Sequence, residues 1–246
     1  MAGHSHWANI KHKKAAIDKK RAKVWGKIAK KIMVAAKSGP DPRDNLSLRY
    51  VIDEARAANM PKATIENAVA KGSGGAGGEG FEEIVYEGYG PFGVALLMEV
   101  LTDNRNRTAG EVRSILERHG GSLSTSGSVA FQFTRQGIFA ISRQGVEEDR
   151  LMELALEAGA QDVRQEGEIY LLFTRPADFG SVKEALAAAS IATESAEIQN
   201  EPANTVELDA QQARQILKLI EALEDNDDVQ NVSHNADVPD AALAEA

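Results

Sequence analysis

A glycine-rich segment divides the chain into two parts with different hydrophobic periods. Before it, apolar residues recur every three or four positions, as on one face of a helix. After it, short strand-like runs alternate with helical segments. The segment contains the spacing Gly72-x-Gly74-x-x-Gly77, which dinucleotide-binding folds place after a strand and before a helix. Here a helical pattern precedes it and a strand pattern follows it, so we interpret residues 73–80 as a flexible linker.

The residues before the linker predict a small bundle of three helices. Val24, Ile28 and Ile32 recur at helical spacing in the first segment, and its lysines fall on the opposite side of the helical wheel. Glycine and proline residues end one segment or begin the next. We assign residues 1–72 to a basic helical domain, whose expected helices cover residues 17–37, 45–58 and 61–72.

Charge is distributed unevenly along the chain. The first 37 residues hold eleven lysines and arginines and one acidic residue, Asp18, whereas the remaining residues hold 17 basic and 36 acidic ones. Charges farther apart than about 8 Å are screened from each other at physiological salt, so a partner meets a basic arm and an acidic body as separate surfaces. A basic terminus of this kind indicates binding to a polyanion, most commonly nucleic acid. The alternatives are a solvated helix face and, less favoured, a membrane surface.

The residues after the linker predict two α/β domains, one inserted in the other. Residues 135–202 have the order strand, helix, strand, strand, helix, strand, which is that of a complete ferredoxin-like unit. The segments on either side are fragments that cannot bury a core alone, so we join residues 81–134 and 203–240 into one discontinuous domain. The expected fold class is therefore α+β, a three-helix bundle followed by two α/β domains. In the discontinuous domain the expected strands cover 81–87, 93–101, 128–133, 205–208 and 229–234, and the expected helices cover 108–119 and 209–223. Thr108 and Glu111 are spaced as a capping box, so we expect Thr108 to cap the first of these helices.

Several classes of function are excluded or disfavoured by what the sequence lacks. There is no cysteine, which removes disulfides and thiolate nucleophiles and fits a reducing compartment. No apolar run reaches the ~18–20 residues of a membrane span, and no secretory signal is recognisable, so we expect a cytoplasmic protein with no membrane partner. The hydrolase motif G-x-S-x-G, the metalloprotease motif H-E-x-x-H, the Walker motif and the kinase motifs are absent. We expect no enzymatic activity, no metal, no cofactor and no small-molecule substrate.

The candidate nucleic-acid-binding residues lie in the basic arm and in one later loop. Lysines suit neutralisation of phosphates rather than reading of base edges, and the histidines and tryptophan between them are able to stack on unpaired bases. Arg105 and Arg107 lie near the start of an expected helix, where backbone N–H groups favour anions; pairing with Asp103, Glu99 or a neighbouring domain is the alternative. The candidates are His6, Trp7, Lys11, His12, Lys13, Lys14, Lys19, Lys20, Arg21, Lys23, Lys27, Lys30, Lys31, Arg105 and Arg107.

Several separated motifs resemble the YebC/PmpR family. They are the head MAGHSHWANIKHKK (1–14), GYGP (88–91), LTDNRNRT (101–108), HGG (119–121) and GSV (127–129). The family is usually described as probable transcriptional regulatory proteins, and it includes a mitochondrial translational activator of cytochrome oxidase subunit I. The resemblance implies a three-domain protein without known catalytic activity that binds DNA or the translating ribosome. Phe92 departs from it, where a smaller residue is expected, and so does Ser233, where many members carry an aromatic one.

Two functions in gene expression stay open at this point. A transcriptional regulator would bind promoter DNA, but no helix-turn-helix, zinc-finger or basic-zipper pattern is visible. A translation factor would hold ribosomal RNA with its lysine-rich arm, and the acidic body suits a bounded RNA–protein pocket better than long duplex DNA. The oligomeric state is not encoded in any recognisable pattern.

Overall fold

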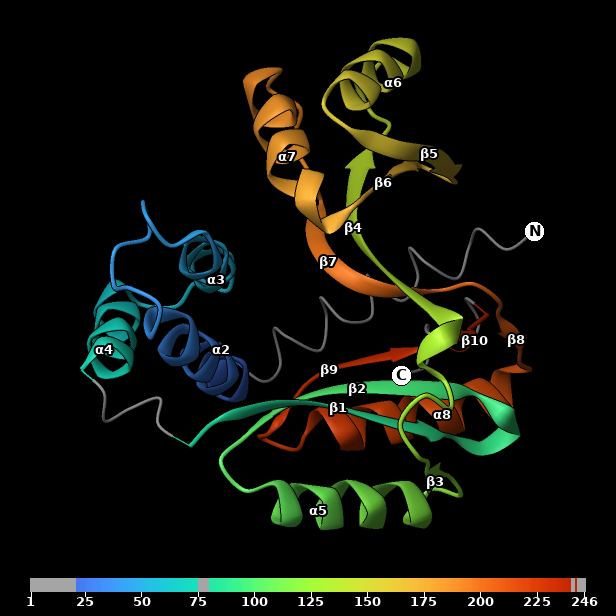
Figure 1. The fold of residues 1–246 in the computed structure, drawn as a ribbon. Coiled ribbons are helices and arrows are strands. Elements are labelled where there is room, and N and C mark those ends of the chain that lie inside the picture. The colour runs from blue at the N-terminus through green and yellow to red at the C-terminus, as the bar shows by residue number, and fades with distance from the viewer. Residues whose placement is uncertain (1–20, 75–79, 240–241, 243–246) are drawn as a thin grey trace. The chain divides into compact units, whose positions relative to one another are not determined.

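The computed structural model describes residues 21–74, 80–239 and 242 (Figure 1). These residues form two units. One contains residues 21–74, 80–128 and 215–232, and the other contains residues 129–214 together with the described residues after 232. Helices followed by a β-rich region confirm the α+β class. In the part of the chain that is described, no helix is long and apolar enough to cross a membrane.

The first unit begins with the predicted three-helix bundle. Its core is formed by Ile28 and Ile32 from the first helix, Leu48 and Ile52 from the second, and Ile65 from the third, all of them buried. These are the apolar positions that recur at helical spacing, so burial of one face of each helix explains the bundle. The described helices are α2 (Arg21–Ala36), α3 (Leu46–Ala57) and α4 (Lys62–Ser73).

The connection between α2 and α3 is fixed by a single buried side chain. Asn45 caps α3 by accepting a hydrogen bond from the backbone N–H of Leu48 at 3.0 Å. Its amide donates to the carbonyl oxygens of Ala35 at 2.7 Å and Gly39 at 2.8 Å, which lie at the end of α2 and just beyond it. The Asn45 side chain therefore supplies hydrogen-bond partners to backbone groups at the end of α2 and at the start of α3.

The first unit continues with a four-stranded sheet that takes its last strand from the C-terminal part of the chain. The order in the sheet is β3-β1-β2-β9, and β1 pairs with β2 antiparallel from Glu82 opposite Thr102 to Tyr89 opposite Ala95. Figure 1 draws α5 and α8 on the same side of these strands. The elements are β1 (Glu82–Tyr89), β2 (Ala95–Thr102), α5 (Arg105–Arg118), β3 (Ser122–Leu123), α8 (Ala210–Glu224) and β9 (Val229–His234).

Two local predictions for the segments on either side of the ferredoxin-like unit are wrong, and one predicted strand is shorter than expected. The strand expected at 128–133 is the short 3-10 helix η2 (Ala130–Gln132), and the edge strand is β3, where Gly88 pairs with Leu123. Helix α5 begins one turn earlier than expected, because Asn104, not Thr108, caps it by accepting from the N–H of Arg107. The strand expected at 205–208 is only β8 (Val206–Glu207), which pairs with β10 (Ala236–Asp237) in a separate two-stranded sheet.

The turn between β1 and β2 contains Phe92, one of the two departures from the family pattern. It lies in the 3-10 helix η1 (Pro91–Gly93) with φ of 64°, in the left-handed region that favours glycine. Its side chain is exposed, so packing does not compensate for this conformation.

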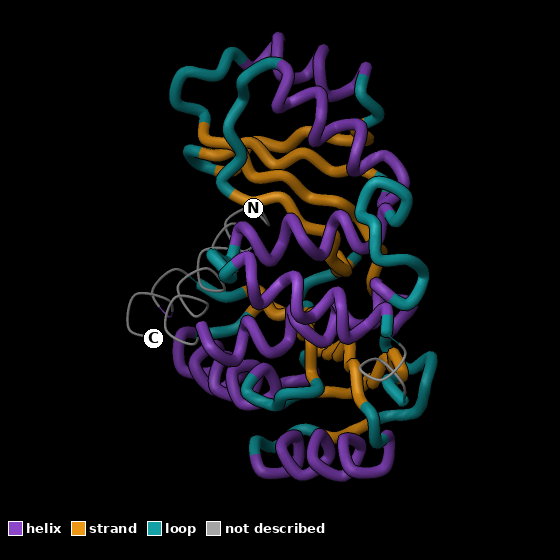
Figure 2. Tube along the Cα trace, turned by 90° about the vertical axis from the view of Figure 1, so that its left-hand side faces the viewer, coloured by secondary structure: helices purple, strands orange, loops and turns teal. Residues whose placement is uncertain are grey.

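The second unit contains the predicted ferredoxin-like fold. Its sheet has the order β5-β6-β4-β7, and one face packs against both helices through Phe139, Leu172 and Val182 (Figures 1 and 2). The rings of Phe139 and Phe179 stack at 4.6 Å between centroids. The elements are β4 (Phe133–Ser142), α6 (Glu148–Glu157), β5 (Ala160–Glu166), β6 (Ile169–Thr174), η3 (Pro176–Asp178), α7 (Phe179–Ala188) and β7 (Ser195–Pro202).

Candidate nucleic-acid interface

The structure describes fewer than half of the predicted nucleic-acid-binding residues. Arg21 is the first described residue, and its place at the start of α2 is all that is described of it. Lys23, Lys27, Lys30 and Lys31 follow along α2, whereas Arg105 and Arg107 lie in the first turn of α5. The predicted residues outside the described range are His6, Trp7, Lys11, His12, Lys13, Lys14, Lys19 and Lys20.

Two of the α2 lysines contact the end of helix α8 and the acidic turn that follows it, which we define as residues 224–228 (Glu-Asp-Asn-Asp-Asp). The ammonium of Lys27 donates to the carbonyl oxygen of Glu224, and that of Lys23 donates to the carbonyl oxygen of Asp225 at 3.1 Å. Lys23 also lies 3.7 Å from the Asp225 carboxylate. Carbonyl groups at a helix C-terminus carry partial negative charge, so cations are favoured there.

A third lysine, one turn further along α2, extends this contact. Lys30 donates to the carbonyl oxygen of Asp227 at 3.0 Å and to the carboxylate of Asp228 at 2.9 Å. Its ammonium also lies 5.9 Å from the centre of the Phe81 ring. Lys23, Lys27 and Lys30 therefore form one row of donors along α2, which we call the lysine row, and the acidic turn supplies the oxygens that it holds.

Burial affects the charge of the central lysine in this row. Loss of hydration lowers the pKa of Lys27 to about 8, although the negative charges of Glu224, Asp227 and Asp225 act in the opposite direction. The charge of Lys27 therefore depends on how deeply its ammonium is buried. Lys31, in contrast, pairs within the bundle, with its ammonium 2.8 Å from the carboxylate of Glu54.

Asp228 joins the lysine row to the start of helix α5. Its carboxylate accepts hydrogen bonds from Lys30 at 2.9 Å, Arg107 at 2.6 Å, Thr108 at 2.8 Å and Thr102 at 3.1 Å. The side chain is only 6% exposed, so these donors replace most of its hydration. A buried carboxylate is stable only when it is paired and hydrogen-bonded in this way.

The ionisation of Asp228 follows from these contacts. Burial alone would raise its pKa, but the hydrogen bonds from Lys30, Arg107 and Thr108 outweigh burial and hold the pKa well below the usual range of a carboxyl group. Asp228 is therefore negatively charged at neutral pH, and Lys30 and Arg107 both pair with it.

Arg107 pairs with carboxylates of the same chain, which is the alternative to anion binding that the sequence left open. Its guanidinium lies 2.9 Å from the carboxylate of Asp103 and 2.6 Å from that of Asp228, and hydrogen bonds to these two groups raise its pKa. Glu99, the other partner considered, accepts instead from Asn231. Arg105 is exposed, and its backbone carbonyl accepts from the hydroxyl of Tyr86 at 3.1 Å.

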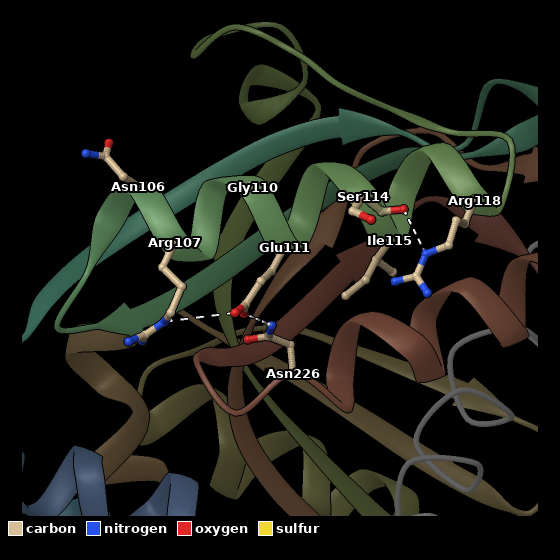
Figure 3. A pocket seen from close by; sticks show the side chains of 8 residues that line it. All are labelled: Asn106, Arg107, Gly110, Glu111, Ser114, Ile115, Arg118 and Asn226. Atoms are coloured by element: carbon tan, nitrogen blue, oxygen red, sulfur yellow. Dashed lines mark hydrogen bonds and ion pairs between the residues drawn. The ribbon is translucent and has the colours of Figure 1, made fainter.

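A shallow groove of about 560 Å³ follows one face of α5 beside the acidic turn (Figure 3). Glu111 lies in its middle, where it accepts from the amide of Asn226 at 2.7 Å and lies 4.0 Å from Arg107. Arg118 lies further along the same helix, where it donates to the backbone carbonyl of Ser114, so both positively and negatively charged side chains line the groove. Its lining residues are Asn106, Arg107, Gly110, Glu111, Ser114, Ile115, Arg118 and Asn226.

Sequence reasoning missed the acidic turn as a partner of the lysines. Each segment is conspicuous by itself: residues 224–228 hold four carboxylates, and lysines recur every three or four positions on α2. Nothing in either segment indicates that they meet across about 200 positions of sequence. Among the described residues, no group of three histidine or carboxylate side chains is placed to hold a metal ion.

Comparisons with known proteins cover nearly the whole chain. Residues 5–75 match the family model described as the TACO1/YebC protein N-terminal domain, and residues 81–236 match that described as the TACO1/YebC second and third domain. A probable transcriptional regulatory protein from Hahella chejuensis is 52% identical, over 99% of this chain and 98% of that protein. Another with the same description, from Desulfatibacillum aliphaticivorans, is 49% identical over the full length of both.

A solved structure shares the fold. The crystal structure of the conserved hypothetical protein Aq1575 from Aquifex aeolicus matches with a TM-score of 0.82 at 44% sequence identity. The match covers 96% of this chain and 98% of that one.

Proposed function

The chain belongs to the TACO1/YebC family, and from that premise we propose that it is a non-enzymatic regulator of gene expression that binds nucleic acid. Relatives with about half of their residues identical are named probable transcriptional regulatory proteins, which supports a regulatory role rather than an enzymatic one. The observation that carries nucleic-acid binding is the concentration of basic residues before position 38, eleven against one acidic residue.

The proposed mode of binding is neutralisation of phosphates. The basic residues are nearly all lysines, which act as point charges and hold a phosphate backbone without reading bases. The exposed Arg105 at the start of α5 adds a donor that suits a phosphate oxygen. We therefore expect affinity that falls steeply with salt and depends little on sequence.

Two physiological targets fit this mode. The names of the relatives favour promoter DNA. A ribosomal RNA target is the second candidate, favoured by the excess of acidic residues after position 37, 36 against 17 basic ones. Such a body is repelled by long duplex DNA, whereas a bounded RNA–protein pocket places phosphates only near the basic arm.

The test combines titration with sedimentation. The purified chain is titrated onto promoter and random duplexes at about 50 and 200 mM salt, and in parallel it is centrifuged with ribosomes. Binding to duplexes without sequence preference, together with co-sedimentation, would assign the protein to translation. A preference of about 10³ or more for one promoter, without co-sedimentation, would assign it to transcription. Absence of binding to DNA, RNA and ribosomes would contradict the proposal.

A further inference from the structure

The lysine row of α2 faces a part of the same chain that resembles a nucleic-acid backbone in its chemistry. Over five residues the acidic turn presents backbone carbonyl oxygens and four carboxylates, and Lys23, Lys27 and Lys30 donate to three of those carbonyls. A phosphate backbone likewise presents a series of negatively charged oxygen acceptors. The same donors therefore suit either partner.

The turn and a nucleic acid cannot both occupy this face at low energetic cost. A phosphate that approaches the lysine row comes close to the carboxylates of Asp225 and Asp228, and like charges at short distance repel. Each lysine also has to leave, or share, an oxygen that it already holds. From this geometry we propose that the acidic turn is a built-in competitor, which withdraws from the lysine row when nucleic acid binds there.

The lysines are able to separate from the acidic turn without leaving a buried charge unpaired. The Lys23–Asp225 pair is about half exposed on both sides, and exposed pairs of this kind contribute little to stability. Release of Lys30 still leaves Asp228 with the hydrogen bonds from Arg107, Thr102 and Thr108, so no buried carboxylate loses all its partners. Release of Lys27 returns a buried ammonium to water, which favours its charged form.

The inference rests on the proposed function, since it names the regulation of the same basic surface. It predicts that the wild-type protein binds nucleic acid more weakly than a variant whose acidic turn does not hold the lysine row. In part of the wild-type population the turn occupies the three lysines, and those molecules do not bind through them. Neutralising the exposed part of the turn increases the competent fraction. The buried Asp228 is left unchanged in this test because Arg107 and the two threonines depend on it.

The experiment is a titration of the full chain against labelled nucleic acid. The probes are a single-stranded RNA and a duplex DNA, each about 20 nucleotides long, at about 50 mM salt. The turn variant is Asp225→Asn/Asp227→Asn. The matched control is Glu153→Gln/Glu157→Gln, which removes the same charge from exposed positions of α6 in the other unit. Each variant is also combined with Lys23→Gln/Lys27→Gln/Lys30→Gln, and circular dichroism confirms that every variant is folded.

We expect the turn variant to bind at least about fivefold more tightly than the control variant, and the difference to vanish when the three lysines are replaced. Equal affinities of turn and control variants, within about twofold, would overturn the competition, as would a gain that persists without the lysines. In either case wild-type binding would leave the proposed function intact. Failure of the wild type and of every variant to bind either probe would instead contradict the proposed function itself.

Discussion

Asp228 is the residue that connects the three-helix bundle with the start of α5. It is nearly buried, and it receives hydrogen bonds from the bundle through Lys30 and from the start of α5 through Arg107 and Thr108. The two cations are thus held around one anion. Removing that anion takes a partner from both cations at once, so its effect on stability is larger than that of an exposed carboxylate.

We expect Asp228→Asn to lower the free energy of unfolding by about 1–3 kcal/mol at neutral pH. The folded-state pKa of Asp228 lies below the unfolded value of about 4, so its contribution is present above pH 4 and is lost as pH falls below it. Urea unfolding at pH 7, 4 and 3 checks this. Wild-type stability decreases between pH 4 and 3 more than that of the variant, whereas the exposed control Asp44→Asn keeps the wild-type slope. An unchanged slope in Asp228→Asn would contradict the assignment.

At the residue scale, sequence reasoning found the cations but not their partners. The lysines of α2 stood out because they recur on one face of a helix rich in Val and Ala. Their acceptors lie 202 positions along the chain for Lys23 and 197 for Lys27 and Lys30. Helical periodicity carries no information about contacts over such a separation, which depend on how the bundle and the sheet pack.

At the scale of elements, the helices and the ferredoxin-like order were predictable because their periods are strong. Addition of β9 to the first sheet also followed from the sequence, since the flanking fragments could not bury a core alone. The strand expected at 128–133 was not found, because a short apolar run in a loop gives the same signal as a buried strand. The start of α5 was shifted because the cap at Asn104 and the alternative at Thr108 both fit helix-capping rules.

Packing of α4 on α2 depends on Gly72. We therefore predict that replacement of Gly72 by alanine changes the free energy of unfolding in the opposite direction from the same replacement at Gly26. A Cβ at Gly72 would clash with the backbone of Met33 and the side chain of Ala36, whereas a Cβ at Gly26 meets nothing. We expect Gly72→Ala to destabilise the fold by about 1–3 kcal/mol. Gly26→Ala should stabilise it by about 0.5–1 kcal/mol, because alanine favours a helix interior. Thermal and urea unfolding measure both, and equal effects of the two substitutions would show that α2 and α4 do not approach as described.

At the scale of the whole molecule, the separation of charge is the property that relates the fold to the proposed function. The bundle carries the lysine row, and the acidic turn at the end of α8 faces it within the same unit. Like charges repel, so under the proposed function we expect the acidic remainder to disfavour a polyanion and leave the N-terminal arm as its binding surface. The sequence predicted this polarity fully, because it depends on composition alone, but not that the chain supplies an internal partner for part of its basic surface.

The most direct test of this account is a map of the residues that contact nucleic acid. The full chain is photo-crosslinked to RNA that contains 4-thiouridine and to duplex DNA that contains 5-iododeoxyuridine, at about 50 mM salt, and the linked peptides are identified by mass spectrometry. We expect crosslinks concentrated in residues 1–37 and 103–107. Crosslinks confined to residues 129–214, or none with either nucleic acid, would contradict it.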